Sequence, residues 1–307
     1  MQDWWQATFP QGRQTLEIID ANGQQVSIAY GEKGQGQPLI LIHGIASWSY
    51  SWRHCIEPLS QYFRVICFDA KGYGFSQKLE HLEQPGHQVI ELERIIRALC
   101  DRPAVIVAES LGALIALAVV QAHPELCDRL VIMNVPIFPT QLPSQGMRLL
   151  SLIPRELIQI VDFLRLSYLF SPLIRAIAEY ERQDVLSDNL KSTPDEVYWL
   201  TYPYVEFPGA IYKLTEELQL SAREIEKLLQ NQPNLISNIQ AQLGNIRCST
   251  LILWSDGDRW FPSTDGEKLR DRIPNSQVQI LENCGHSASS SCPAAVNTAI
   301  LGFLSNL

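Results

Sequence analysis

The chain is 307 residues long, with 46% hydrophobic and 19% charged residues, which is the composition of a folded globular protein rather than of a disordered one. Acidic residues outnumber basic ones by 33 to 24, so the net charge is −9, and the lack of a basic run to neutralise phosphates excludes nucleic acid as a partner. No apolar stretch reaches the roughly 18 residues that a membrane span requires.

The first half of the chain alternates between predicted strands and predicted helices. It opens with two apolar segments, Thr15–Ile19 and Val26–Tyr30, around a turn sequence at residues 20–23. Buried strands are predicted next at Leu39–Ile42, Val65–Phe68, Ala104–Ala108 and Leu130–Met133. Helical patterns lie between them at Trp52–Tyr62, Val89–Leu99 and Leu111–Gln121. This alternation predicts a parallel sheet with helices on both faces.

The segment from Pro136 to Asn245 has no convincing strand and is helical and apolar in pattern. Capping-box sequences that begin at Thr193 and at Ser221 predict two helix starts. Strands are predicted again at Thr250–Trp254 and Val278–Leu281, and helices at Gly266–Arg272 and Ala294–Leu304. We therefore predict one sheet domain, residues 1–135 and 246–307, interrupted by a helical cap, residues 136–245.

A serine stands where a predicted buried strand meets a predicted helix, in Ala-Glu-Ser-Leu-Gly at residues 108–112. A tight strand-to-helix turn strains the backbone of such a serine, and the residues two before and two after it must be small. Ala108 and Gly112 meet this need, although glycine is the commoner residue at the first of these places. We therefore predict that Ser110 is a nucleophile.

The loop after an earlier strand contains His43-Gly44. The backbone must turn beneath the nucleophile here and present an N–H group, which would form an oxyanion hole together with the N–H group of Leu111. We expect the side chain of His43 only to hold its loop.

A carboxylate and a base are expected after the two last strands. Residues 254–262 read Trp-Ser-Asp-Gly-Asp-Arg-Trp-Phe-Pro, and Asp258 is favoured as the acid because Asp-x-x-x-Pro follows this strand. Asp256 is the alternative, and its other role would be a turn residue beside Gly257. Asn-Cys-Gly-His at residues 283–286 follows the last strand and places His286 as the base.

These motifs, with Asp-Ala-Lys-Gly-Tyr-Gly-Phe-Ser at residues 69–76, resemble the α/β-hydrolase superfamily with a helical cap, over nearly the whole chain. The resemblance implies an eight-stranded, mostly parallel sheet flanked by helices. Residues 43–53 resemble the epoxide hydrolase and haloalkane dehalogenase branch, whose nucleophile is an aspartate followed by tryptophan. This chain has Ser110-Leu111 there, so no alkyl-enzyme ester forms and no indole N–H meets a halide, which disfavours both chemistries.

The resemblance implies a serine hydrolase with Ser110 as nucleophile, His286 as base and Asp258 as the residue that orients the base. The N–H groups of Ile45 and Leu111 would hold the oxyanion. An ester or thioester would be cleaved through an acyl-enzyme without a metal or an organic cofactor. Two alternatives stay open: a C–C bond hydrolase or cofactor-free oxygenase with the same triad, and a slow-turnover or non-catalytic ligand-binding protein.

The pocket is expected to take a small to medium, largely apolar ester. Four aromatic residues on nearby loops are the candidates for its lining, and the alternative is that they only pack within the protein: Trp48, Tyr50, Trp260 and Phe261. Residues 156–174 of the cap are too apolar for a simple surface helix, and we expect them to pack on the sheet domain; the alternative is that they roof the pocket or touch a membrane surface. Glu109 is expected either to be hydrogen-bonded behind the nucleophile or to tune the site.

Seven cysteines are scattered along the chain, and most lie in apolar runs. Buried, unpaired thiols are typical of a reducing compartment, so we predict a cytoplasmic protein and no disulfide between Cys284 and Cys292, although these two are close in sequence. No CxxC or HExxH spacing indicates a zinc site. The first residues include Asp3 and lack the apolar segment of a signal peptide.

Overall fold

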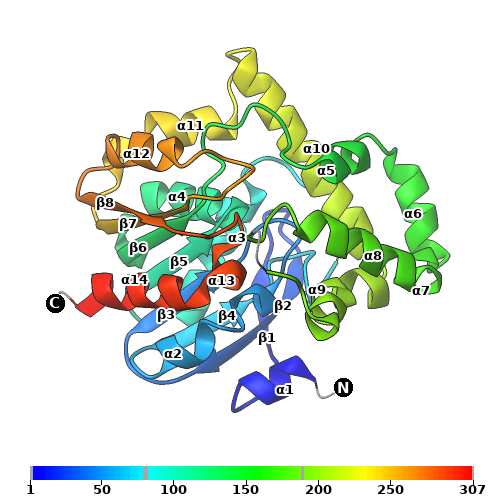
Figure 1. The fold of residues 1–307 in the computed structure, drawn as a ribbon, viewed down its shortest axis with the longest axis horizontal. Coiled ribbons are helices and arrows are strands. Elements are labelled where there is room, and N and C mark those ends of the chain that lie inside the picture. The colour runs from blue at the N-terminus through cyan, green and yellow to red at the C-terminus, as the bar shows by residue number, and fades with distance from the viewer. Residues whose placement is uncertain (1–2, 79–81, 188–189, 306–307) are drawn as a thin grey trace.

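The computed structural model describes residues 3–78, 82–187 and 190–305, which form one sheet with helices on both faces and a further group of helices to one side (Figure 1). The strands are β1 (Gln14–Ile19), β2 (Gln25–Lys33), β3 (Pro38–Ile42), β4 (Arg64–Phe68), β5 (Ala104–Glu109), β6 (Cys127–Met133), β7 (Ser249–Ser255) and β8 (Ser276–Leu281). Each of the predicted strands is present, so the prediction of an eight-stranded sheet is confirmed.

The strands lie in the order β1-β2-β4-β3-β5-β6-β7-β8. β2 pairs antiparallel with both β1 and β4, and the other neighbours pair parallel. Every residue of β3 and of β5 is buried, because helices cover both faces of the sheet. This double burial is why the central strands appear in the sequence as uninterrupted apolar runs.

Two cores lie on the two faces of the sheet. Ile40 and Ile42 of β3 belong to one core, and Leu39 and Leu41 belong to the other, since successive side chains of a strand point to opposite faces. The first face is covered by α3 (His87–Leu99), α4 (Leu111–Ala122), α11 (Leu235–Ala241) and α12 (Thr264–Arg270). The second is covered by α1 (Trp4–Thr8), α2 (Ile56–Ser60), α13 (Ala288–Ser291) and α14 (Pro293–Ser305).

The chain between β6 and β7 is helical, as its pattern predicts. It contains α5 (Gln145–Ser151), α6 (Arg155–Phe163), α7 (Leu166–Leu169), α8 (Ser171–Arg182), α9 (Pro194–Glu206), α10 (Ala210–Leu229) and α11, followed by a short 3₁₀ turn at Leu243–Asn245. Two other 3₁₀ turns lie before β6, at Ser49–Trp52 and Pro124–Leu126. None of the helices in the described ranges is long and apolar enough to cross a membrane. The domain boundaries at residues 135 and 246 stay a prediction.

The two capping boxes have different outcomes. Thr193 caps α9 with both bonds of the box formed, which confirms the first predicted start. The second prediction is wrong, because Ser221 lies inside α10. Residues from Ala210 to Leu229 contain no glycine or proline that would interrupt the helix, so the box sequence lies within it without starting a new helix.

One further local prediction needs correction, and one helix of the structure was not predicted. The expected helix Trp52–Tyr62 is divided into the 3₁₀ turn that ends at Trp52 and helix α2. Pro58 has no N–H group to donate to a preceding turn, so it is accommodated only in the first turn of a helix. Helix α1 was not predicted from the sequence; the carboxylate of Asp3 accepts a hydrogen bond from the N–H group of Trp5 at 2.8 Å and caps it.

The apolar stretch at residues 156–174 does not bury its apolar side on the sheet. Helix α6 packs against α10 and helix α8 packs against α9. Leu157 and Leu173 are more than half exposed, and Phe163 is 85% exposed. The prediction that this stretch packs on the sheet domain is therefore wrong, because the inner faces of these helices are taken up by other helices while apolar residues also occupy their outer faces.

Candidate active site

Ser110 lies in the turn between β5 and α4 with a positive φ of 55°, in a region that residues with a side chain rarely adopt. The turn is tight: a Cβ atom on Gly112 would lie 2.3 Å from the carbonyl oxygen of His43. Ala108, buried in β5, is the small residue on the other side. The local geometry therefore holds the serine side chain clear of the strand and in front of the N-terminus of α4.

The imidazole of His286 lies between Ser110 and Asp258. Its Nε2 atom is 2.9 Å from Oγ of Ser110, and its Nδ1 atom is 2.8 Å from Oδ2 of Asp258. The other carboxylate oxygen of Asp258 accepts hydrogen bonds from the N–H groups of Trp260 and Phe261, at 2.8 and 3.0 Å. A carboxylate held in this way keeps the proton on Nδ1, which leaves Nε2 free to accept the proton of the serine.

Asp256 takes a different role from Asp258. Its Oδ1 atom accepts a hydrogen bond from the N–H group of Cys284 at 3.2 Å. The adjoining Gly257 approaches the same loop closely, since a Cβ atom there would lie 2.8 Å from the carbonyl oxygen of Cys284. The structure thus brings Asp258 to His286 and places the alternative carboxylate in the turn.

Ile45 and Leu111, the two residues predicted to form the oxyanion hole, line the same pocket as Ser110. Leu111 is the first residue of α4, so its N–H group is one of those at a helix N-terminus that have no partner within the helix. Ile45 follows Gly44, whose lack of a side chain matters here: a Cβ atom would lie 2.9 Å from Cβ of Ser110.

The side chain of His43 holds its loop, as expected. Its Nδ1 atom is 2.9 Å from the carbonyl oxygen of Gly44, and its Nε2 atom accepts a hydrogen bond from the N–H group of Ala70 at 3.0 Å. Burial lowers the pKa of His43, which favours the neutral ring that this pair of contacts requires.

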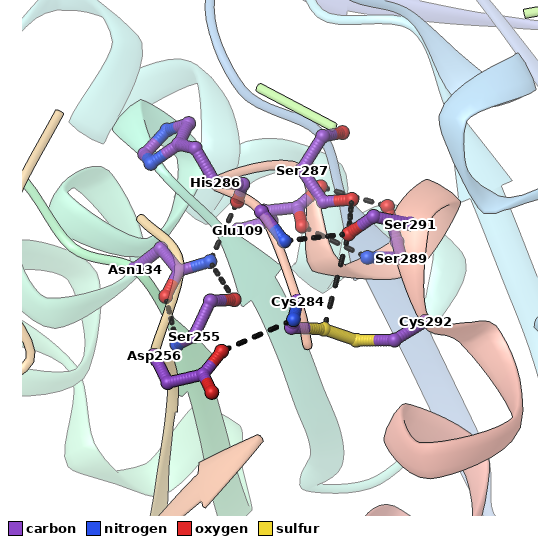
Figure 2. Close-up of a disulfide and its surroundings, with 11 residues drawn as sticks. Glu109, Asn134, Ser255, Asp256, Cys284, His286, Ser287, Ser289, Ser291 and Cys292 are labelled. Atoms are coloured by element: carbon purple, nitrogen blue, oxygen red, sulfur yellow. Dashed lines mark hydrogen bonds between the residues drawn. A yellow bond between two sulfur atoms is a disulfide. The ribbon is translucent and has the colours of Figure 1, made fainter. Parts of the chain in front are cut away.

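Glu109 is hydrogen-bonded behind Ser110, as the first of its two expected roles requires. Its carboxylate accepts hydrogen bonds from the N–H group and the hydroxyl of Ser289, at 3.0 and 2.8 Å (Figure 2). Burial raises the pKa of Glu109. The contact ties the end of β5 to α13, directly after the loop that carries His286.

Asn134, which the sequence motifs do not include, holds the loop that carries His286. It follows β6 with a positive φ of 48°, and its amide donates hydrogen bonds to the carbonyl oxygen of His286 at 2.6 Å and to the hydroxyl of Ser255 at 3.0 Å (Figure 2). Its carbonyl oxygen accepts one from the N–H group of Ser255 at 2.9 Å. A lone asparagine after an apolar strand was the only available signal.

Cys284 and Cys292 form a disulfide on the other side of the His286 loop, so the prediction that they are unpaired is wrong (Figure 2). The turn through Gly285 and the short helix α13 bring their Cα atoms to 5.6 Å, a separation that suits a disulfide. The remaining cysteines are free. The cytoplasmic location stays a prediction, and this disulfide does not favour it.

A pocket of about 940 Å³, partly open to solvent, reaches Ser110. Trp260 and Phe261 line it, and their rings lie 4.5 and 5.5 Å from the ring of His286. Met147 of α5, Leu218 of α10 and several residues of α4 and α11 complete an apolar wall. The pocket is therefore enclosed between the sheet and the helices that follow β6.

Trp48 was predicted to line this pocket, and the prediction is wrong. Its side chain is fully buried and packs among aromatic residues that include Trp4, Trp5 and Phe75. Its indole N–H group donates to the carbonyl oxygen of Trp199 at 3.1 Å. An aromatic residue on a loop near a site is not distinguished by sequence from one that packs under the loop.

One side of the pocket is acidic. Glu83, Glu217 and Glu224 line it, and the described lining residues include no lysine or arginine. Burial, followed by the nearby carboxylates of Glu83, Glu216 and Glu91, raises the pKa of Glu217 to about 8.

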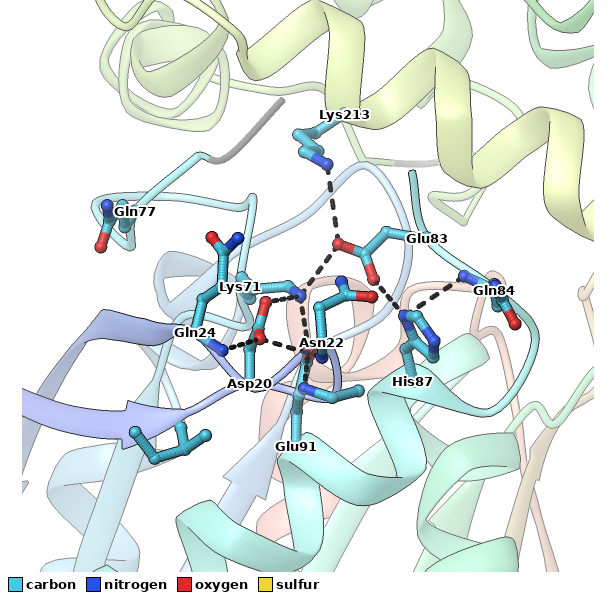
Figure 3. A network of polar contacts seen from close by, with 12 residues as sticks. Asp20, Asn22, Gln24, Lys71, Gln77, Glu83, Gln84, His87, Glu91 and Lys213 are labelled. Carbon is cyan, nitrogen blue, oxygen red and sulfur yellow. Dashed lines mark hydrogen bonds and ion pairs between the residues drawn. The ribbon is translucent and has the colours of Figure 1, made fainter. Parts of the chain in front are cut away.

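A buried polar network joins the pocket wall to the sheet (Figure 3). Lys71 forms ion pairs with Asp20 and Glu83, each at 2.9 Å, and with Glu91. His87 and Lys213 also contact Glu83, at 3.0 and 3.6 Å. Glu83, which lines the pocket, is thus paired with both lysines, while neither lysine is among the described lining residues.

The order of the strands and the turn that carries Ser110 define the α/β-hydrolase class. The family model described as alpha/beta hydrolase fold matches residues 37–291 of this chain. The chain therefore belongs to the α/β-hydrolase family.

Curated relatives and solved structures agree with this assignment. The chain is 26% identical to a 2-hydroxy-6-oxononadienedioate/2-hydroxy-6-oxononatrienedioate hydrolase of Escherichia coli, over 93% of each chain. It is 25% identical to epoxide hydrolase 4 of Mus musculus, over 94% of this chain and 78% of that one. An alpha/beta hydrolase fold protein from Burkholderia ambifaria superimposes with a TM-score of 0.73 at 21% identity, over 94% of this chain and 97% of that one.

Proposed function

We propose that the protein is a serine hydrolase that cleaves a small to medium, largely apolar carboxylic ester or thioester. The observation that carries this proposal is the continuous chain of hydrogen bonds from Asp258 through His286 to Ser110. An ordinary serine hydroxyl is a weak nucleophile, and an adjacent imidazole base that is itself oriented by a carboxylate activates it.

The reaction follows from this geometry. His286 takes the hydroxyl proton as Oγ of Ser110 attacks the carbonyl carbon, and the N–H groups of Ile45 and Leu111 hold the resulting oxyanion. The tetrahedral intermediate collapses to an acyl-enzyme as the imidazolium returns the proton to the leaving alcohol or thiol. Water, deprotonated by His286, then attacks the acyl-enzyme and releases the acid. In this proposal residues 136–245 are the cap that shapes the pocket above Ser110.

The epoxide hydrolase chemistry that one relative's name implies is not favoured. In the epoxide hydrolase branch that residues 43–53 resemble, the nucleophile is an aspartate that forms an alkyl-enzyme ester. Position 110 is a serine in this chain, and residue 111 is leucine.

A second candidate is hydrolysis of a C–C bond beside a carbonyl with the same triad. The bacterial relative is named as a hydrolase of 2-hydroxy-6-oxononadienedioate and 2-hydroxy-6-oxononatrienedioate. Its named substrates are dicarboxylates. The described lining of the present pocket carries Glu83, Glu217 and Glu224 without a lysine or arginine, and its histidine, His87, already contacts Glu83 at 3.0 Å. A dianion would therefore meet three carboxyl groups and no lysine or arginine to pair with. This observation favours a neutral ester over a dicarboxylate.

The proposal is tested by labelling with a fluorophosphonate probe, peptide mass spectrometry and a series of p-nitrophenyl esters of increasing acyl length. We expect the label on Ser110, ester turnover, and loss of both in Ser110→Ala. Ser221→Ala changes another serine of the same pocket and should keep both. Labelling without turnover of any ester would favour the C–C hydrolase, and a folded protein with an unreactive Ser110 would favour a ligand-binding protein.

A further inference from the structure

Exposed hydrophobic side chains gather on the helices that follow β6. Of the 19 large hydrophobic residues that are exposed in the described part of the chain, 12 lie between Leu149 and Tyr180. We call these 12 residues the cap patch: Leu149, Leu152, Leu157, Ile160, Phe163, Leu164, Tyr168, Leu169, Phe170, Leu173, Ile177 and Tyr180. Phe163 is 85% exposed, Leu152 77% and Tyr180 72%. Scattered exposed leucines are ordinary in a folded protein, but a concentration in about 30 successive residues is not.

The exposed residues repeat at helical spacing. On α6 they are Leu157, Ile160 and Phe163, while Asp162 on the inner side accepts a hydrogen bond from the N–H group of Tyr212 in α10 at 3.0 Å. Each helix of this kind normally turns polar residues outward, and here an apolar stripe occupies the solvent side.

Helix α8 repeats this arrangement. Leu173, Ile177 and Tyr180 are exposed at spacings of four and three residues, while its other side packs on α9. Two successive helices thus carry outward apolar stripes. Twelve large side chains, each more than half exposed, present on the order of 1,000 Å² of apolar surface, whereas the largest patch of a typical monomer covers roughly 300–600 Å².

The charge of this region differs from that of the rest of the chain. Residues 145–182 contain five arginines and four acidic residues, which gives a net charge of +1. Since the whole chain has a net charge of −9, the rest of the chain carries −10. One of the four acids, Asp162, is buried. The cap patch therefore lies in a part of an acidic protein that carries no excess of negative charge to be repelled by an anionic or zwitterionic surface.

The shape of the region favours a bilayer over a protein partner. Helices α6 and α7 lie at the outer corner of the molecule, on the side away from α12 and α14 (Figure 1). A projecting apolar corner enters the boundary between lipid headgroups and acyl chains without a shaped partner surface, whereas a second copy or another protein would need a surface complementary to it. Arg165 and Tyr168 are both exposed, and the guanidinium of Arg165 lies 5.7 Å from the centre of the Tyr168 ring. They provide a cation and an aromatic ring of the kind found at the headgroup level.

We propose that the cap patch docks the protein on the surface of a lipid bilayer, with α6 and α8 lying in the plane of the interface and their apolar stripes among the acyl chains. Helix α5 belongs to both surfaces, because Met147 lines the pocket and Leu149 is exposed in the cap patch. Docking would therefore hold the pocket next to the bilayer. This inference does not depend on which bond the enzyme cleaves.

Flotation of the full chain with phosphatidylcholine vesicles tests the proposal. We expect the protein to float with the vesicles at both 0.1 and 0.5 M salt, because the contact is mainly apolar. Phe163→Ser combined with Leu169→Ser should lower the partition coefficient at least 10-fold. Tyr62→Ser combined with Leu229→Ser is the matched control, since these residues are 63% and 56% exposed outside the cap patch, and it should bind as the unchanged protein does.

Thermal melting and probe labelling of Ser110 should be the same in all three proteins, which separates loss of docking from loss of fold. The proposal is overturned if the unchanged protein stays with the soluble fraction, or if the cap-patch variant floats as well as the control. A dimer that is seen by light scattering, separates in the cap-patch variant and does not float would show instead that the patch binds a second copy.

Discussion

The side-chain amide of Asn134 donates a hydrogen bond to the carbonyl oxygen of His286, across 2.6 Å. This bond fixes the backbone of the residue whose imidazole must reach Ser110. Asn134→Asp keeps the size of the side chain and its tolerance of a positive φ, but it removes both donated bonds and turns an oxygen toward the carbonyl of His286. We expect kcat to fall roughly 10²-fold, because small misplacements of a catalytic group have effects of that size.

The split between the kinetic constants separates positioning from binding. KM should change little in Asn134→Asp, because Asn134 is absent from the described pocket lining. Asn134→Gly, which also accepts a positive φ, should show the same loss of kcat if the folded protein tolerates it. Unchanged kcat in a variant with a normal melting temperature would contradict a positioning role.

The two carboxylates of the loop after β7 form a matched pair. Asp258→Asn removes the charge that orients His286, and kcat on an ester should fall about 10⁴-fold. Asp256→Asn keeps an oxygen that accepts the bond from the N–H group of Cys284, so kcat should stay close to that of the unchanged protein. Equal losses in both variants would argue against the assigned triad.

Glu217 should make substrate affinity depend on pH. Its pKa of about 8 means that it is largely neutral at pH 7 and becomes charged as the pH rises through 8. A charge in an apolar pocket opposes an apolar ester, so KM should increase above pH 8. The groups that act on it are Glu83, Glu216 and Glu91, which raise the pKa, and Lys213, which lowers it. Glu217→Gln should remove the increase, and a persisting increase would assign it to another group.

The same shift affects stability. The ordinary pKa of this group is 4.5, so between about pH 4.5 and 8 the folded protein holds a proton that the unfolded chain releases. The stability that this group contributes is therefore complete below pH 4.5 and lost as the pH rises through 8. Glu217→Gln should have a higher melting temperature than the unchanged protein at pH 8 and a similar one at pH 4.5. Glu226→Gln, on the exposed side of the same helix, should show no such difference.

The disulfide between Cys284 and Cys292 should stabilise the loop that carries His286. Closing a loop of this length restricts the unfolded chain by about 2–3 kcal/mol in the chain-entropy account. Reduction, or the double change Cys284→Ala and Cys292→Ala, should lower the melting temperature, and non-reducing peptide mapping should find the pair linked. Complete alkylation of both thiols without a reductant would contradict the bond.

The sheet was predictable because burial on both faces makes strands such as β3 and β5 uninterrupted apolar runs. The positions of Ser110, Asp258 and His286 were predictable because each follows a strand end, and the ends of parallel strands meet at one edge. The burial of Trp48 could not be predicted, because it depends on α1 and α9, which lie far from Trp48 in the sequence. The apolar stretch of α6–α8 was interpreted as buried because periodicity indicates an apolar face without indicating what covers it.

Asn134 and Glu217 mark the limit of the sequence argument in a different way. Neither belongs to a recognisable motif, and each forms a hydrogen bond with a residue more than 100 positions away: Asn134 with His286, and Glu217 with Gln88. Only the packed structure brings such pairs together, so these two residues could not be found from sequence motifs as Ser110 and His286 were.

The helices between β6 and β7 leave the sheet and return to it at adjacent strands, where Met133 pairs with Leu253. The register of β6 against β7 therefore does not depend on the length or the sequence of the segment inserted between these two strands. Ser110, Asp258 and His286 all lie outside the insertion, whereas Met147, Leu218 and Glu217 lie inside it. Exchange of this one segment would change the pocket, and with it the substrates that fit, without changing Ser110, Asp258 or His286. The insertion is therefore the place to begin a redesign of specificity.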